Sequence, residues 1–183
     1  MKSNFFMFLM LFIGVMANAE FLTIPFAHGD PGVQIIQYSH MLLIENPESE
    51  ILDTNYTFTN KESAYQLRYS FFKQTVPDYE HTRAAFAMFC LSIFWNIAGY
   101  EAQELVNFND IDVKKDFNGD YGFFGFIRDP ESDFCSGFKY VLVSFFCKEN
   151  KGIIVKTLLF NNPSFIRFDD TYFEIYNSFR FTE

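Results

Sequence analysis

The sequence predicts an α+β fold in which an antiparallel sheet is sandwiched between helices. Three observations predict it. Two segments of alternating polar and apolar residues come first, a long uncharged segment follows, and two strongly apolar segments joined by a short polar loop come last. Alternation with a period of two is typical of strands. Because strands and helices are grouped along the chain instead of alternating regularly, an α+β architecture is favoured.

The first 19 residues have the pattern of a secretory signal peptide. Lys2 gives a short basic start, residues 5–16 are apolar, and Ala17-Asn18-Ala19 matches the small-residue cleavage site. The apolar run is too short for a membrane span, and no lipid-accepting cysteine follows it. We therefore expect cleavage after Ala19, a secreted or periplasmic location, and a single globular domain over residues 20–183.

The chain is acidic and rich in aromatic residues. It has a formal net charge of −9 at pH 7, with 27 phenylalanines and 10 tyrosines. An acidic surface argues against nucleic acid or anionic lipid as a partner, and it fits either a cationic protein partner or simple solubility. The aromatic residues favour a strand-rich core, and an aromatic-lined ligand cavity is the alternative interpretation.

The N-terminal half predicts strands. Residues 21–31 form a lead-in with Pro and Gly, and the apolar segment from Val33 to Ile44 predicts one long strand. Residues 52–59 and 65–71 then alternate between apolar and polar side chains. The alternation predicts two strands, each with one solvent-facing side, joined by a hairpin over residues 60–63.

A long helix is predicted over about residues 79–104, with Asp78 as its N-cap. Its middle, from Ala84 to Tyr100, contains no charged residue and is close to the shortest length that spans a membrane. Ser92, Asn96 and Gly99 interrupt the apolar pattern. We therefore expect a buried central helix covered on most sides, and no membrane span after removal of the signal peptide.

The C-terminal half predicts a loop with a short strand at residues 108–115 and then more strands. A segment over residues 120–128 contains Gly122 and Gly125, which indicate a bulge or a close backbone approach. Residues 138–147 and 153–160 are apolar on both faces, which is typical of central strands, and residues 148–152 join them. A closing helix is predicted over about residues 169–180, capped by Asp169 or Asp170.

Three segments carry a resemblance to a known family. They are the strand over residues 65–70 that leads into the long helix, the late hairpin of residues 140–147 and 153–160, and the terminal segment of residues 172–179. Together they resemble the superfamily of the PsbP photosystem subunits and the bacterial DcrB lipoproteins. The resemblance implies an α/β/α sandwich and action by protein binding without catalysis. Because the lipid-accepting cysteine of the lipoprotein branch is missing, it implies a fold more than an activity.

No residue is assigned to a catalytic, cofactor-binding or metal site. The sequence has no G-x-S-x-G, H-E-x-x-H, C-x-x-C or phosphate-binding glycine loop. His28 and Asp30 are the weak start of a metal site without a recognisable third ligand. His40 is expected on a strand in the core, and His81 on the surface of the first helical turn. Glu48 and Glu50 are expected to be solvated, and Asn55-Tyr56-Thr57 matches a glycosylation acceptor.

The three cysteines are Cys90, Cys135 and Cys147. An odd number leaves at least one without an intramolecular partner. A continuous strand between Cys135 and Cys147 would hold their Cα atoms more than roughly 20 Å apart, too far for a disulfide. We expect all three to be small core residues; a reactive thiol, for example Cys135 with His28, is the alternative.

Three functions follow from these observations. The first is a non-catalytic exported binding or accessory protein of the cell envelope that acts through a protein-interaction surface and needs no cofactor. The alternative is a carrier of an apolar ligand, held in an aromatic-lined cavity between the sheet and the helix of residues 84–98. The second alternative is a thiol-dependent enzyme or redox protein that uses Cys135 or Cys147.

Overall fold

The computed structural model describes residues 20–26, 30–62, 64–73, 83–100, 104–149, 151–166 and 170–183. Strands dominate the fold, and most of the helical residues lie in α2 and α3. In chain order the elements are β1 (Glu20–Phe26), β2 (Asp30–Gln37), β3 (Leu42–Ile44), β4 (Tyr56–Thr59), β5 (Tyr65–Lys73), α2 (Arg83–Ala98), β6 (Val106–Asn107), α3 (Asp110–Phe117), β7 (Tyr121–Arg128), η1 (Asp133–Cys135), β8 (Tyr140–Lys148), β9 (Gly152–Phe160), η2 (Pro163–Ile166), α4 (Asp170–Tyr176) and β10 (Phe179–Phe181).

A seven-stranded antiparallel sheet is the central layer, with strand order β3-β4-β5-β9-β8-β7-β6. Its three middle strands form long ladders, and β9 pairs over its whole length with both β5 and β8. Alternate residues of β9 enter different cores: Ile154 and Leu158 face one side, whereas Val155 and Leu159 face the other. The predicted central strands and their connecting hairpin are therefore confirmed.

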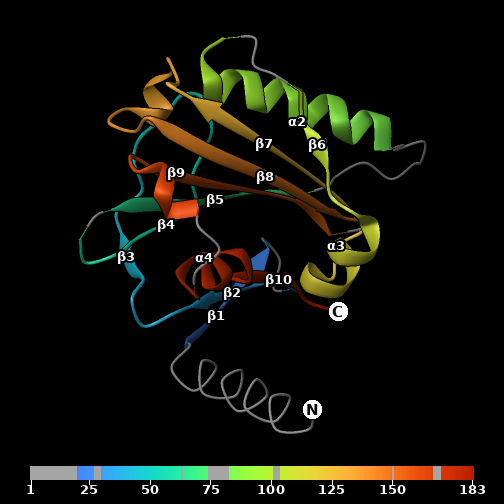
Figure 1. Ribbon diagram of the computed structural model, residues 1–183. Helices are drawn as coiled ribbons and strands as arrows, with labels where there is room; N and C mark the ends of the chain where they lie inside the picture. Colours follow the sequence, from blue (N-terminus) through green and yellow to red (C-terminus); the bar gives the residue numbers. More distant parts are fainter. Residues whose placement is uncertain are drawn as a thin grey trace, which may run out of the picture.

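The two faces of this sheet are covered by different layers. Figure 1 shows α2 lying across one face, whereas α4 and a small sheet of order β1-β2-β10 lie against the other. Since helices cover both faces of an antiparallel sheet, the predicted α+β fold is confirmed. The small sheet was not predicted, because its strand β10 lies almost 150 residues after its partner β2 in the chain.

The central helix is shorter and less covered than predicted. The predicted start near residue 79 lies outside the described residues, and the predicted end near residue 104 is wrong because α2 ends at Ala98. Gly99 follows with a φ of 81°, and its N–H donates to the Trp95 carbonyl at 2.9 Å. This left-handed conformation ends the helix and favours glycine. Coverage on most sides is also wrong, because α2 is buried along one side only.

The predicted close approach at Gly125 is confirmed. A Cβ atom at this position would lie 2.5 Å from two ring atoms of Phe94, the aromatic residue that α2 places against β7. The absent side chain therefore lets α2 pack directly on the sheet. Gly122 has the same role for α3, since its Cβ would lie 3.0 Å from Val113.

Predictions near the N-terminus need correction. The expected lead-in of residues 21–31 forms β1 and the start of β2, which pair with each other. The long strand over residues 33–44 is broken by a turn in which the Met41 N–H donates to the Tyr38 carbonyl at 2.8 Å. After this turn, β3 leaves the small sheet and pairs with β4 in the large one.

The solvent-facing sides expected for β4 and β5 are largely buried. Thr57, Arg68 and Ser70 are buried although they are polar, because both faces of the large sheet are covered. Hydrogen bonds satisfy the polar groups: the Thr57 hydroxyl donates to the Asn46 side chain at 3.0 Å, and Arg68 donates to the Phe134 carbonyl at 2.5 Å. The alternation of polar and apolar residues in β4 and β5 therefore distinguishes two buried faces of the sheet, instead of a buried face from a solvent-facing one.

Two C-terminal predictions also change. Residues 110–117 form α3 instead of a loop, with the Asn109 side chain accepting from the Ile111 N–H at 2.9 Å as an N-cap. The closing helix α4 ends at Tyr176, short of the predicted residue 180, and Phe179 belongs to β10. The hydrogen bond from the Ser178 N–H to the Ile175 carbonyl makes the turn between them.

Candidate functional site

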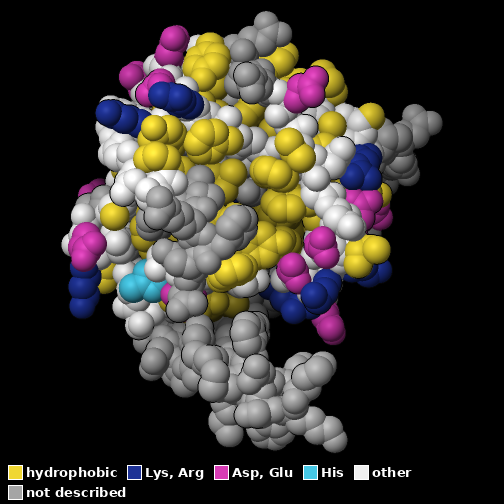
Figure 2. All heavy atoms as spheres, viewed as in Figure 1, with side chains coloured by type: hydrophobic (Ala, Val, Ile, Leu, Met, Phe, Trp, Pro, Cys, Tyr) yellow, Lys and Arg dark blue, Asp and Glu magenta, His cyan; other side chains and the backbone are white. Residues whose placement is uncertain are grey.

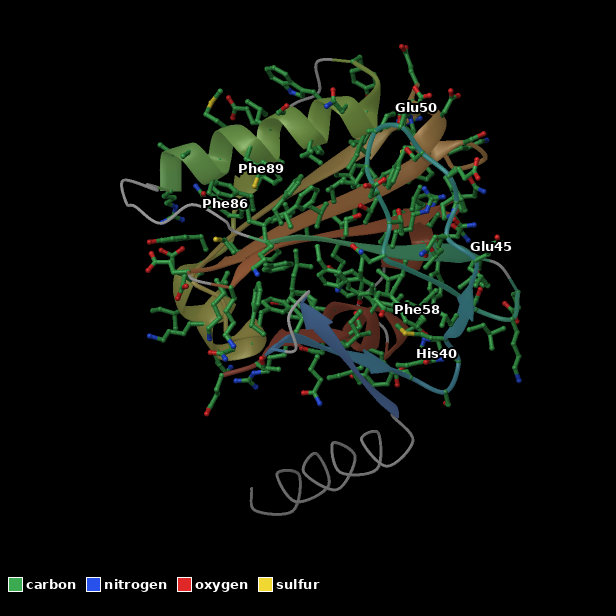
Figure 3. The ribbon with its side chains drawn as sticks, turned by 180° about the vertical axis from the view of Figure 1, so that it is seen from behind. His40, Glu45, Glu50, Phe58, Phe86 and Phe89 are labelled. Carbon is green, nitrogen blue, oxygen red and sulfur yellow. The ribbon has the colours of Figure 1, made fainter. Side chains whose placement is uncertain are left out.

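The outward side of α2 is an exposed surface without charge. We call it the α2 surface; it consists of the exposed residues Ala84, Ala85, Met88, Ser92 and Asn96 with the half-buried Leu91 and Trp95 beside them. Met88 is 66% exposed. Figure 3 shows Phe86 and Phe89 on the opposite side of the helix, toward the sheet. A surface helix ordinarily presents charged residues to solvent, so this surface is unusual for an acidic protein.

The described part of α2 has 16 residues, whereas a helix that spans a membrane needs about 20. Among the residues that the structure describes, no helix is long and apolar enough to cross a membrane.

An open groove of about 540 Å³ continues the α2 surface at the C-terminal end of the helix. We call it the α2 groove. Trp95 and Tyr100 contribute aromatic rings, and the exposed Glu131 and Asp133 contribute carboxylates. The Tyr100 hydroxyl donates to the Arg128 carbonyl at 3.0 Å, which fixes its ring at the rim. Aromatic rings beside carboxylates are suited to a Lys or Arg side chain.

A second cavity lies on the opposite face of the sheet, between β7–β9 and α4. We call it the α4 cavity; its volume is about 270 Å³. Its aromatic lining residues are Phe108, Phe124, Phe126, Phe146, Tyr172 and Tyr176. Figure 2, in the same view as Figure 1, shows hydrophobic side chains gathered across the middle of the visible side of the molecule, below α2. The carrier hypothesis placed an apolar cavity against α2, but the aromatic-lined cavity is on the other side, because Phe94 and its neighbours pack tightly between α2 and the sheet.

Lys156 is the charged residue that lines the α4 cavity. It is 6% exposed, and burial lowers its pKa to about 7. Its ammonium donates to the carbonyl oxygens of Ile175 and, at 3.0 Å, of Tyr176, at the C-terminal end of α4. The ammonium also lies 5.6 Å from the ring centre of Phe179. Among the described residues, no carboxylate forms an ion pair with it.

Comparison with solved structures identifies the fold of this chain. A solution structure of cyanobacterial PsbP (CyanoP) from Synechocystis sp. PCC 6803 matches with a TM-score of 0.54 over 91% of this chain and 94% of that chain. The fold is PsbP-like. Sequence identity is 10%, so the match confirms the predicted resemblance as one of fold. No protein-family model matches the chain, and no curated protein matches it.

The three cysteines of this PsbP-like fold are buried in the core and form no disulfide with one another. Burial raises the pKa of Cys90, raises that of Cys135 to about 11 and raises that of Cys147 to about 12. The Cys135 thiol also donates to the Ile97 carbonyl at 3.4 Å. Because the thiolate is the reactive form, these environments disfavour the thiol-dependent enzyme.

The predicted polar candidates do not form a common site among the described residues. His28, His81 and Asp169 lie outside these residues, Asp30 begins β2, and Asp170 begins α4. His40 lies in a turn instead of on a strand, and its Nδ1 is 3.0 Å from a carboxylate oxygen of Glu174. Burial lowers the pKa of His40, which disfavours the charged form of the ring. Within the described part of the chain, no three His, Cys, Asp or Glu side chains are grouped to hold a metal.

The exposed polar candidates are spread over the surface. Glu48 and Glu50 are exposed, as predicted. Asn55 is also exposed, and its side-chain oxygen accepts from the Phe71 N–H at 2.8 Å. Glycosylation at Asn55 therefore stays a prediction from the sequence pattern.

Sequence reasoning missed Lys156, although a signal for it was present. It is the one charged residue in the apolar segment Ile153–Phe160, which was predicted to be a central strand covered on both sides. A lysine in such a strand must be buried, and a buried lysine needs a partner. Its neighbour in the cavity, Ser144, is its register partner on β8.

Proposed function

We propose that this protein is a non-catalytic, exported binding protein of the cell envelope that acts through the α2 surface and the α2 groove. The observation that carries the proposal is the uncharged outward side of α2, where Met88 is largely exposed and no charge occurs from Ala84 to Ala98. Exposed apolar surface of this kind, bordered by polar residues, is typical of interaction sites. The resemblance to the PsbP superfamily supports protein binding over catalysis, and the first 19 residues support export.

The partner is a protein that presents an apolar patch with a Lys or Arg at its edge. The apolar patch would cover Met88 and Leu91, and the basic side chain would enter the α2 groove between the Trp95 ring and the carboxylates of Glu131 and Asp133. Such a contact combines apolar burial with a cation–π and an ionic interaction. A second copy of this chain fits less well, because copies with a net charge of −9 repel each other.

Site-specific photocrosslinking in the producing cells tests this proposal. One variant carries p-benzoylphenylalanine in place of Met88. The matched control carries it in place of Leu43, which is 52% exposed on β3, the edge strand at the other end of the large sheet from β6 and β7. Its register partner Phe58 belongs to the core on the side of the sheet away from α2. We expect a crosslink to one discrete protein from position 88, none from position 43, and loss of the crosslink when Glu131→Lys and Asp133→Lys are added.

Three results would contradict the proposal. A crosslink from position 88 to a second copy of the chain would assign the α2 surface to self-association. A crosslink to lipid would assign it to a membrane surface. Equal crosslinks from both positions, unchanged by the charge reversals, would show that the α2 surface has no specific partner.

A further inference from the structure

We propose that the α4 cavity binds a small apolar carboxylate, with Lys156 as the partner of its acid group. The cavity lies on the opposite face of the seven-stranded sheet from the α2 surface. The proposal therefore goes beyond the proposed protein binding and does not depend on it.

The walls of the cavity determine the body of the ligand. Six aromatic rings line it, and Leu142, Leu158 and Ile175 add aliphatic surface. Phe126 is partly exposed at 46%, so the cavity is open to solvent beside this ring. The volume of about 270 Å³ is close to the lower end of the roughly 300–1,000 Å³ of ordinary ligand pockets. The size and the lining fit a small apolar body instead of a two-chain lipid.

The polar end of the cavity determines the head group. Ser144 and Lys156 are paired residues on β8 and β9, so their side chains leave the same face of the sheet side by side. A lysine ammonium has three N–H donors, and the carbonyls of Ile175 and Tyr176 accept two of them. The third donor and the Ser144 hydroxyl are suited to the two oxygens of a carboxylate.

The charge of the site favours an anion over a neutral ligand. The ion pairs among the described residues include none to Lys156, and carbonyl dipoles alone accept its hydrogen bonds. A buried cation without a counter-charge destabilises a folded protein, and a bound carboxylate would offset that cost. One ammonium matches one negative charge, so a carboxylate fits better than a dianionic phosphate. Residues that break the rules of core packing are often found at functional sites.

The cavity does not suggest a hydrolase. Ser144 and Lys156 are neighbours, but no hydrogen bond between their side chains occurs among the described residues, and Lys156 donates to α4 instead. A serine nucleophile needs a base within hydrogen-bonding distance. The arrangement therefore supports binding and not bond cleavage.

Methyl NMR of the isotope-labelled full chain tests the proposal. The probes are decanoate, 2-naphthoate and decanol, each used below its aggregation limit. The methyl groups of Leu142 and Ile175 report on the cavity, and those of Val141 and Val143 report on the opposite face of β8. The variant is Lys156→Met, which keeps an unbranched side chain one heavy atom shorter and removes the charge, and the matched control is Lys139→Met at an exposed lysine.

We expect a carboxylate to shift the Leu142 and Ile175 methyl signals saturably and to leave those of Val141 and Val143 unchanged. Decanol should bind about tenfold more weakly than decanoate, because it lacks the charge-assisted hydrogen bond. Lys156→Met should lower decanoate affinity to that of decanol, and Lys139→Met should not change it. The preference between decanoate and 2-naphthoate distinguishes a flexible from a flat ligand.

The proposal is overturned if neither carboxylate shifts the cavity methyl signals of the wild-type protein. It is also overturned if decanoate and decanol bind equally well, or if Lys156→Met leaves decanoate affinity unchanged. The comparison of probes on the wild-type protein does not depend on the folding of any variant.

Discussion

Replacement of Lys156 by Met should make the protein's stability less dependent on pH. Burial lowers the pKa of this lysine from 10.5 to about 7. Between these two values the unfolded chain holds a proton that the folded chain has lost. The free energy of unfolding of the wild type therefore rises with pH across this window.

The magnitude follows from the same pKa. Well inside the window each pH unit is worth about 1.4 kcal/mol, but at pH 7 half of the folded molecules still hold the proton, so the wild type should gain roughly 2 kcal/mol relative to Lys156→Met between pH 7 and pH 9. The variant also loses the two hydrogen bonds to the carbonyls of Ile175 and Tyr176. Losing these bonds lowers the stability of the variant by about 1 kcal/mol for each bond. This loss is the same at every pH, so it does not change how the stability difference between the two proteins varies with pH.

Urea unfolding of both proteins at pH 6, 7, 8 and 9 measures the slope. The thiols and tyrosines are the same in both proteins, so their titration cancels in the difference. We expect Lys156→Met to be the more stable protein at pH 6 and its advantage to shrink as pH rises above 7. A difference in the free energy of unfolding that stays constant from pH 6 to pH 9 would show that folding does not lower the pKa of Lys156.

Three further predictions concern the core. Gly125→Ala should lower the free energy of unfolding by roughly 1–3 kcal/mol, measured by thermal unfolding, because its Cβ would lie 2.5 Å from the Phe94 ring. The added change Phe94→Leu should recover part of this loss. A Gly125→Ala variant as stable as the wild type would contradict the close packing at this position. Cys90, Cys135 and Cys147 should react slowly with a thiol reagent in the native protein and rapidly in denaturant, and one fast native thiol would contradict the burial. Tyr69→Phe should cost about 1 kcal/mol in urea unfolding, because it removes the 2.5 Å hydrogen bond to Ser178, and an unchanged midpoint would show that the bond contributes nothing.

The centre of the fold was predictable from local pattern. β8 and β9 are long, apolar on both faces and joined by a polar loop, so each side of the hairpin has only one plausible structure. Gly125 was correctly interpreted as a close approach, although the sequence could not identify Phe94 as its neighbour. The fold class follows from these elements.

The rest depends on contacts between residues far apart in the chain. The turn between Tyr38 and Met41 contains neither Gly nor Pro, so the apolar segment around it resembles one strand. Arg68 alternates with apolar residues like a solvent-facing residue, but its hydrogen bond to the Phe134 carbonyl allows it to be buried. Hydrogen-bond partners that lie far apart in the sequence can be identified only from the folded structure.

In the candidate sites, too, some features were predictable from the sequence and others depend on contacts between distant residues. A single lysine in a buried strand is visible in the sequence, whereas its position against the carbonyls at the end of α4 is not. The uncharged segment of α2 was correctly identified, but the sequence predicted that it would be covered on most sides. The exposure of Met88 is the feature that changes its interpretation from core to interaction surface.

Native mass spectrometry of the protein, purified gently from its own cells, tests the protein-binding claim most directly. We expect a complex of one copy of the chain with one different protein, and we expect this complex to be lost when Glu131→Lys and Asp133→Lys are introduced. The wild-type chain found only alone, or only as multiples of its own mass, would contradict the claim that the α2 surface binds another protein.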